Sequence, residues 1–110
     1  MIDASEYSGT GLIPLGTLGT GSTEVVNTQY SKDAWVGLKG TAGDTFALEG
    51  SLDNTANSYD NMDVNDSSIT INASGIGRGW FEGKLPPYLR VTRVAGTGTT
   101  TIQLLIGAVS

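Results

Sequence analysis

The chain has 110 residues, a formal charge of −5, and neither His nor Cys. Its 16 Gly, 14 Thr, 10 Ser and 6 Asn make up 46 of the 110 residues, which is typical of strands and turns rather than helices. Without His and Cys, the chain lacks the commonest general base, thiol nucleophiles, thiolate metal sites and disulfides. Its acidic charge is the opposite of a nucleic-acid binder's, so we expect no nucleic-acid partner.

Targeting and membrane segments are also not expected. No basic segment followed by an apolar run opens the chain, and no stretch approaches 18 consecutive apolar residues. At this length one domain is the natural expectation. The sequence therefore predicts a small protein that is assembled without secretion and without a membrane partner.

The first 22 residues differ from the rest of the chain. They hold five glycines and a proline, which exclude a helix. Their apolar residues, among them Leu12, Ile13 and Leu15, are too numerous for a flexible linker. We predict a Gly/Thr-rich N-terminal arm over residues 1–22, docked on its own domain or on a neighbour, and a single domain over residues 23–110. A frayed end with one short edge strand is the alternative.

Residues 33–40 and 44–53 alternate between apolar and polar positions, which is typical of strands with one buried face. A short turn with two glycines joins them, so the pair is predicted to form a hairpin. Trp35 lies on the face opposite Ala34 and Val36. Either Trp35 belongs to the core and these two residues do not, or Trp35 is presented outward.

Residues 53–68 read DNTANSYDNMDVNDSS, with almost nothing to bury. Asp and Asn satisfy their own backbone in turns, so this tract is predicted to be a long surface loop. Calcium is an alternative, and its oxygen ligands would come from Asp60, Asp63, Asn65 and Asp66. The EF-hand spacing is not met, because the sixth position from Asp63 is Ser68 and not Gly.

The last third of the chain returns to alternating segments, at residues 69–73, 88–94 and 101–106. Two prolines introduce the second of these segments, and the glycine turn AGTGT precedes the third, which predicts another hairpin. The final segment is apolar on nearly both faces. It is therefore expected to be a central strand or to be covered by another chain.

These elements predict seven or eight strands and no helix. A single sheet would leave its apolar stripe in water, at about 25 cal/mol per Å² of apolar surface. Two sheets packed about 10 Å apart bury both stripes. We therefore predict an all-β fold, a two-sheet antiparallel β-sandwich, with the jelly-roll and Ig-like Greek-key strand orders both open.

Three motifs follow one another over residues 34–107: a strand ending in EGSLD (residues 49–53), a proline-introduced strand PYLRV (87–91), and a glycine turn before the final strand (96–104). In this order they resemble small β-sandwich virion proteins of tailed bacteriophages. Some proteins of this build are capsid decoration, or cement, proteins that sit as trimers on the icosahedral shell. The resemblance implies a homotrimer on the outer capsid surface, made in the host cytoplasm, with the major capsid protein as partner and no cofactor.

The charged residues offer little catalytic chemistry. Glu49 and Glu82 are the types that a glycosidase needs as a carboxylate pair, but Glu49 lies on the polar face of its strand and so small a sandwich offers little cleft. We therefore do not expect an enzyme. Arg90 and Arg93 have opposite parity on one strand, so with Arg78 they make no basic stripe. Pairing of arginine with Glu49 or Glu82 across the sheet is expected instead.

The exposed aromatic residues admit two interpretations. Trp35, Trp80 and Phe81, with Tyr88, resemble a stacking platform for carbohydrate. Alternatively, apolar side chains on the polar face of a strand are explained if a second chain covers them. We favour this second interpretation, and the predicted interface consists of Leu12, Ile13, Leu15, Trp35, Trp80, Phe81 and Leu105.

The sequence thus favours a structural virion protein, specifically a capsid decoration protein. Such a protein would dock across neighbouring major-capsid subunits and stabilise the shell by binding only its assembled form. The N-terminal arm is the candidate for reaching a neighbour. The alternative function is a glycan-binding or connector module of a phage fibre or tail, with Trp35, Trp80 and the loop over residues 53–68 as the glycan site.

Overall fold

The fold is a computed structural model that describes residues 1–7, 9–29, 31–62 and 68–107. In this part of the chain it has ten strands and one short 3-10 helix. The elements are β1 (Ile2–Asp3), η1 (Ala4–Tyr7), β2 (Leu12–Leu18), β3 (Val26–Asn27), β4 (Lys32–Lys39), β5 (Thr45–Ser51), β6 (Asp60–Asn61), β7 (Ile69–Thr70), β8 (Ile76–Lys84), β9 (Tyr88–Ala95) and β10 (Thr100–Ile106).

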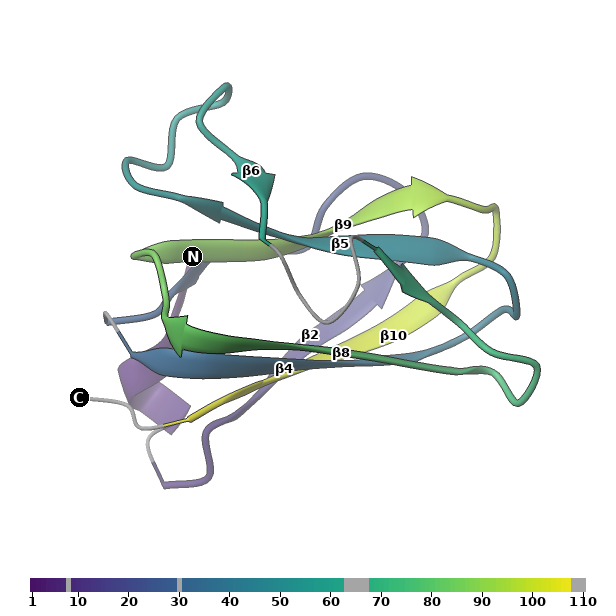
Figure 1. The fold of residues 1–110 in the computed structure, drawn as a ribbon, viewed down its shortest axis with the longest axis horizontal. Helices are drawn as coiled ribbons and strands as arrows, with labels where there is room; N and C mark the ends of the chain where they lie inside the picture. The colour runs from purple at the N-terminus through teal and green to yellow at the C-terminus, as the bar shows by residue number, and fades with distance from the viewer. Residues whose placement is uncertain (8, 30, 63–67, 108–110) are drawn as a thin grey trace.

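Two sheets lie one over the other (Figure 1). The four-stranded sheet has the order β2-β10-β4-β8, and the six-stranded sheet has the order β1-β3-β9-β5-β6, with β7 also paired to β5. Of the pairs between described strands, only β1 with β3 is parallel. The predicted all-β sandwich is confirmed. Ten strands replace the expected seven or eight, and four of them, β1, β3, β6 and β7, have only two residues each. Of these four, β7 lies in the segment 69–73 that alternation predicted.

The long strands change sheet as the chain proceeds. β2, β4, β8 and β10 belong to one sheet, while β3, β5 and β9 belong to the other. In an Ig-like sandwich, consecutive strands such as A and B, or F and G, share a sheet. The strand order is therefore that of a jelly roll, which resolves the choice that the sequence left open.

The two glycine turns are corners between the sheets, and their prediction as hairpins was wrong. The turn after β4 leads to β5 in the opposite sheet, and the turn after β9 leads to β10 in the opposite sheet. Gly43 and Gly96 have φ values of +90° and +113° in these turns, a region that favours glycine. Alternation predicts the two faces of a strand, but it does not predict which sheet the strand joins.

The core lies between the inner faces of the two sheets. On β10, even-numbered positions are buried and odd-numbered positions are exposed, as the alternation predicts. The buried apolar residues of the core are Ala4, Ile13, Val26, Ala34, Val36, Leu38, Phe46, Leu48, Ile69, Ile71, Leu85, Leu89, Val91, Ile102, Leu104 and Ile106. Both sheets contribute to this single cluster, so each depends on the other for burial.

The predicted N-terminal arm packs on its own domain, which was one of the two positions left open. Its residues form β1, η1 and β2, and β2 is an outer strand that pairs with β10 from Leu12 to Leu18. Ile13 is completely buried. The final strand, β10, lies between β2 and β4, so it is central in its sheet as expected. No described helix is long and apolar enough to span a membrane.

A buried ion pair ties the six-stranded sheet to the last corner. Arg93 Nη1 lies 2.9 Å from Asp44 Oδ2, and the two side chains are only 7% and 8% exposed. Asp44 Oδ2 also accepts a hydrogen bond from the backbone N–H of Gly98, and Arg93 donates to the carbonyl of the same residue. The pair therefore fixes the glycine turn that carries the chain from β9 to β10.

A second ion pair crosses two neighbouring strands of the same sheet. Arg90 Nε lies 2.8 Å from Glu49 Oε1, with the side chains 26% and 16% exposed. The two residues are direct partners in the β5–β9 register. The expected pairing of an arginine with Glu49 is thereby confirmed.

These two pairs predict different stability losses. Asp44→Asn leaves the Arg93 charge buried without its partner, so we expect a loss of about 3 kcal/mol in the free energy of unfolding. Glu49→Gln removes the charge from a pair that water reaches, so we expect about 1 kcal/mol. Urea unfolding followed by circular dichroism measures both variants. Equal losses would contradict the structural role given to Asp44.

Candidate interaction surface

Four apolar side chains form one row across the outer face of the four-stranded sheet. Leu12 on β2 pairs with Leu105 on β10, Leu105 pairs with Trp35 on β4, and Trp35 pairs with Trp80 on β8. The four side chains are between 38% and 43% exposed. We call this set the apolar row. It runs perpendicular to the strands and reaches from one edge of the sheet to the other.

Stacked rings form one end of the apolar row. The ring centroids of Trp35 and Trp80 lie 5.1 Å apart at an interplanar angle of 23°. Such a pair contributes about 0.5–1.5 kcal/mol beyond the area that it buries. The chain has two tryptophans in all, and both are in this row. In this stacked arrangement Trp35 remains 42% exposed and Trp80 38% exposed.

The local sequence explains why several side chains of β8 point outward. Inward positions of the strand include Gly77 and Gly79, which are buried. A Cβ added at Gly77 would lie 3.2 Å from Leu38 and 3.4 Å from Ile71, so glycine allows these core side chains to pack close to the strand. Ile76, Arg78 and Trp80 point outward from β8, while Phe81 packs against the core.

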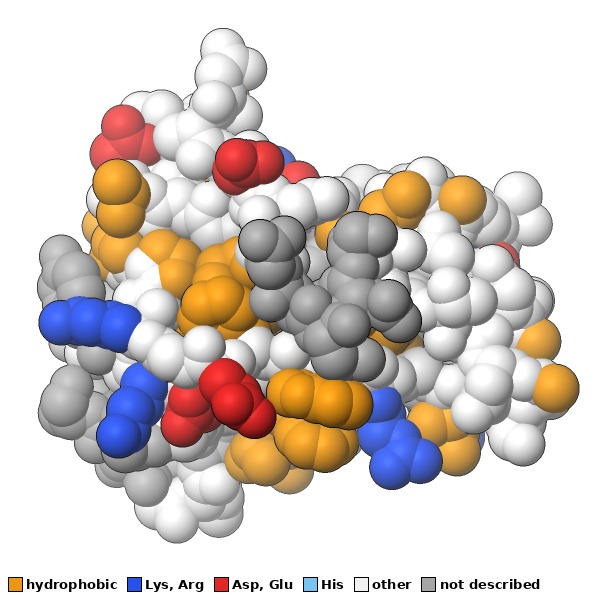
Figure 2. Space-filling view, in the orientation of Figure 1, with side chains coloured by type: hydrophobic (Ala, Val, Ile, Leu, Met, Phe, Trp, Pro, Cys, Tyr) orange, Lys and Arg blue, Asp and Glu red, His pale blue; other side chains and the backbone are white. Residues whose placement is uncertain are grey.

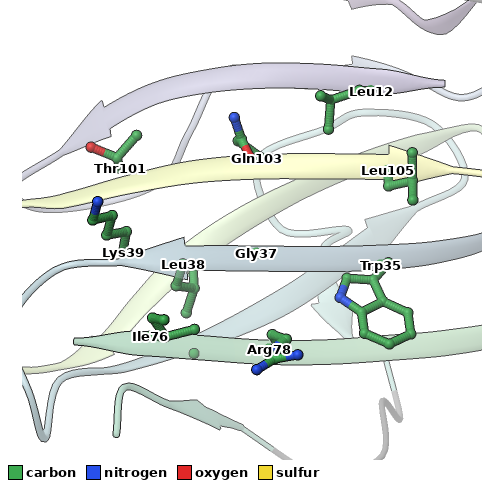
Figure 3. A pocket seen from close by; sticks show the side chains of 11 residues that line it. Leu12, Trp35, Gly37, Leu38, Lys39, Ile76, Arg78, Thr101, Gln103 and Leu105 are labelled. Carbon is green, nitrogen blue, oxygen red and sulfur yellow. The ribbon is translucent and has the colours of Figure 1, made fainter. Parts of the chain in front are cut away.

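A hollow lies beside the apolar row, above Gly37 (Figure 3). Its volume is about 510 Å³, and the absence of a side chain at Gly37 makes its floor. Trp35 and Leu105 close the hollow at the end next to the row, while Lys39 and Arg78 line the rest of it. Among the described residues, neither of these two cations has an acidic partner within 4.0 Å. We call this space the basic hollow.

A second hollow of about 490 Å³ lies on the other side of the same row. It is lined by Asp33 and Glu82, together with the far sides of Trp35 and Trp80. Asp33 Oδ1 accepts a hydrogen bond of 2.8 Å from the backbone N–H of Gly83, which fixes the carboxylate at this end. We call this space the acidic hollow. Figure 2 shows the resulting spatial arrangement over β8, in which apolar side chains lie between acidic and basic ones.

The structure brings four of the seven predicted interface residues together as the apolar row. Ile13 was predicted wrongly: it has the opposite parity to Leu12, so its side chain points into the core and is fully buried. Leu15 and Phe81 are half-buried and pack against the core, so they contribute little to the outer face. Tyr88 lies on β9, in the other sheet, and does not join Trp35.

Sequence reasoning missed the polar members of this face. The basic hollow is lined by Lys39, Arg78 and Gln103, which are outward-pointing residues of β4, β8 and β10. The alternation along each of these strands already indicated that the three side chains point outward. Their neighbourhood depends on the register of β4 with β8 and β10, which pairs Gly37 with both Arg78 and Gln103.

The other predicted sites are not assembled in the described part of the chain. Glu49 lies on β5 and Glu82 on β8, in opposite sheets, so the two do not form a carboxylate pair. Of the calcium candidates, Asp63, Asn65 and Asp66 lie outside the described residues. Among the described residues, no group of three or more His, Cys, Asp or Glu is placed to hold a metal ion.

The described start of the acidic loop satisfies its own polar groups. Hydrogen bonds from Ser58 and Thr55 hold the pKa of Asp53 below its usual value. Tyr59 packs beneath Arg90, whose guanidinium lies 3.9 Å from the ring centroid, and burial raises the pKa of the Tyr59 hydroxyl. This pattern agrees with the expected turn-rich loop, in which Asx and Ser side chains cap their own backbone.

Comparisons with known proteins place the fold beside a phage protein. No protein-family model matches the chain, and no curated protein matches it either. Among solved structures, the SPBc2 prophage-derived protein YomS is similar over 86% of this chain and 89% of its own, with a TM-score of 0.62 and 11% sequence identity. At this identity the likeness shows the shared β-sandwich fold.

Weaker similarities are found to carbohydrate-binding modules. A β-1,3-glucan-binding module of family 6 from Bacillus halodurans covers 98% of this chain and 99% of its own, with a TM-score of 0.49 and 11% identity. A module of Cellvibrio mixtus lichenase 5A, solved with cellotriose, has a TM-score of 0.45 and 14% identity over 94% of each chain. Likeness at this level does not extend to ligands.

The apolar row is predicted to contribute less to folding than the core does. Trp80→Ser removes an edge-strand side chain that is 38% exposed, together with its stacking on Trp35, so we expect a loss of about 1–2 kcal/mol in the free energy of unfolding. Leu48→Ala serves as the comparison, because it opens a cavity in the core and is expected to cost about 2–5 kcal/mol. Urea unfolding measures both. A loss for Trp80→Ser as large as that for Leu48→Ala would mean that the row holds the fold together.

Proposed function

We propose that this protein is a structural component of a phage particle, specifically a capsid decoration protein on the outer shell. The observation that carries the proposal is the apolar row, a strip of two tryptophans and two leucines. These side chains are exposed on the outer face of a sheet whose inner face is already buried in the core. Apolar patches flanked by polar groups mark interaction surfaces. In the assembled particle, this face is covered by protein.

The proposed mechanism is mechanical and thermodynamic. The protein binds across subunits of the major capsid protein and recognises only the assembled shell. A ligand present at 100 times its dissociation constant stabilises the state that it binds by about 2.7 kcal/mol per site. Many copies on one shell would add such contributions at each junction. The exposed tryptophans suit this task, because Trp is enriched among the residues that dominate binding energy at protein interfaces.

Two further observations support a phage role. The motifs over residues 34–107 resemble virion proteins of tailed phages, and the fold is similar to that of a prophage-derived protein. The described residues assemble no catalytic carboxylate pair and no metal-ligand cluster that would favour an enzyme.

Attachment to shells tests this function. The chain is mixed with empty shells formed by the major capsid protein of the same phage, and bound chain is measured by co-sedimentation. We expect hundreds of copies per shell and a higher shell melting temperature. Trp80→Ser should lower occupancy at least about tenfold, since a central Trp contributes 2 kcal/mol or more at many interfaces.

Val94→Ser is the matched control for this experiment. It removes another exposed apolar side chain, 56% exposed, from β9 in the opposite sheet. Its occupancy should equal that of the unaltered chain. Failure of the unaltered chain to sediment with shells, or a copy number of about a dozen or fewer per particle, would contradict a decoration role and favour a tail component.

A glycan-binding module of a fibre or tail is the second candidate function. The basic hollow favours it, because an aromatic wall at Trp35 stands next to hydrogen-bonding side chains at Gln103 and Arg78. Sugars bind to proteins by stacking on aromatic rings while their hydroxyls bond to such groups. A volume of about 510 Å³ lies within the usual range for small-ligand sites.

A glycan array probed with the whole chain tests this second function. If it is correct, at least one glycan class should bind, and Trp35→Ala should lower the affinity by about tenfold or more. Tyr59→Ala is the control, because the Tyr59 ring packs against Arg90, which belongs to the other sheet. Absence of binding across the array, with shells bound normally, would remove the glycan function.

A further inference from the structure

We propose that a second copy of this chain covers the outer face of the four-stranded sheet in a two-fold symmetric dimer. The apolar row of each copy inserts into the basic hollow of the other. The inference concerns the free protein in solution, where a second copy covers the face that the proposed function turns toward the shell, so the two contacts compete for one surface. Its test in solution needs no shell, so the two can fail separately.

The outward side chains form parallel rows, and on β4 successive rows differ sharply in side-chain size, with Trp35 in one row and Gly37 in the next. Next to the apolar row lies a row formed by Gln103, Gly37 and Arg78, which are paired across β10, β4 and β8. The row after it holds Thr101, Lys39 and Ile76. Successive outward residues on a strand lie about 6.6 Å apart. A ridge of indole rings is thus followed, one step along the strands, by a depression with glycine at its floor.

A ridge beside a depression is complementary to itself after a half-turn. The two-fold axis lies between the facing sheets of the two copies. It runs parallel to the apolar row, midway between this row and the neighbouring row that contains Gly37. The half-turn reverses the strand direction and exchanges the two rows. Trp35 of each copy then lies over Gly37 of the other, and the leucine end of each row lies near the partner's Gln103. An isologous contact of this kind closes after two copies.

The charges on the face obey the same operation. The acidic hollow, with Asp33 and Glu82, lies one step beyond the apolar row, and Lys39 lies two steps away on the opposite side. The half-turn brings Asp33 of each copy over Lys39 of the other, with Glu82 diagonally beside it. It also brings each Arg78 over the partner's Trp80 ring, which is a favourable cation–π arrangement. Stacking with the strands parallel would instead place like charges opposite each other.

The balance of charge argues for a second copy rather than an unrelated partner. The whole chain carries −5, so copies repel each other in most orientations. The outer face of the four-stranded sheet has two acidic and two basic residues in these hollows. Both signs of charge are needed for the face to be complementary to itself. Four strands of seven to nine residues span roughly 500 Å² in projection. Side-chain relief brings this area towards the roughly 600–1,000 Å² per partner of specific interfaces.

Sedimentation velocity and tryptophan fluorescence test the dimer directly. We expect a species of twice the 11.4 kDa chain mass that dissociates on dilution. Because both tryptophans lie in the apolar row, dilution should shift their emission to longer wavelength as the rings become exposed to water. A monomer at all concentrations up to about 100 μM, or a trimer, would overturn the proposal.

Two kinds of variant test the arrangement. Gly37→Leu fills the floor of the basic hollow, where an added Cβ meets nothing within 4 Å, so the single chain should keep its melting temperature while dimer affinity falls at least about tenfold. Lys39→Glu sets a carboxylate opposite the partner's Asp33, and Glu82→Lys sets an ammonium beside the partner's Lys39, so each should weaken the dimer about fivefold. The Lys39→Glu/Glu82→Lys double variant should regain part of the lost affinity, because its two new charges attract each other across the interface while Asp33 still faces position 39.

Asp60→Lys is the matched control for Glu82→Lys. It makes the same change in net charge on β6, in the opposite sheet, and should leave dimerisation unchanged. Loss of affinity that the double variant does not restore, or equal weakening by Asp60→Lys, would overturn the proposed register. A folded Gly37→Leu variant that dimerises normally would do the same. Shell binding by a strictly monomeric chain would keep the proposed function and reject the dimer.

Discussion

A two-layer sandwich buries only one face of each strand, and this constraint governs the whole molecule. The inner faces of both sheets share one core, from Ile13 on β2 to Ile106 on β10. The six-stranded sheet covers its outer side partly with polar side chains and ion pairs such as Arg90–Glu49. The four-stranded sheet instead presents tryptophan and leucine outward. These side chains lie outside the core, and this is the observation from which we propose association with another molecule.

The sequence predicted what depends on neighbouring residues in the chain. Alternation alone correctly assigned the all-β sandwich, and the choice between Trp35 and its neighbours Ala34 and Val36 is resolved with Trp35 outward. The apolar final strand was rightly expected to be central, which β10 is. These successes share one cause: a period of two is a local property, and burial of one face follows from it directly.

What the sequence could not predict depends on which strands become neighbours. Both glycine turns look like hairpin turns, yet each carries the chain across the core to the opposite sheet. The Asp44–Arg93 pair joins residues 49 positions apart, and no local pattern links them. The apolar row likewise exists only because β8 pairs with β4 in the register that sets Trp80 against Trp35. Register is a property of the assembled sheet, so the site could be predicted residue by residue but not as a surface.

The pairing of β2 with β10 sets the order in which the molecule can be completed. The two strands are far apart in the sequence, so the four-stranded sheet cannot be completed before both β2 and β10 have been synthesised. Contacts between such distant segments form slowly compared with local ones. The apolar row draws one leucine from each of these two strands. The complete apolar row therefore exists only once β10 has joined the sheet between β2 and β4.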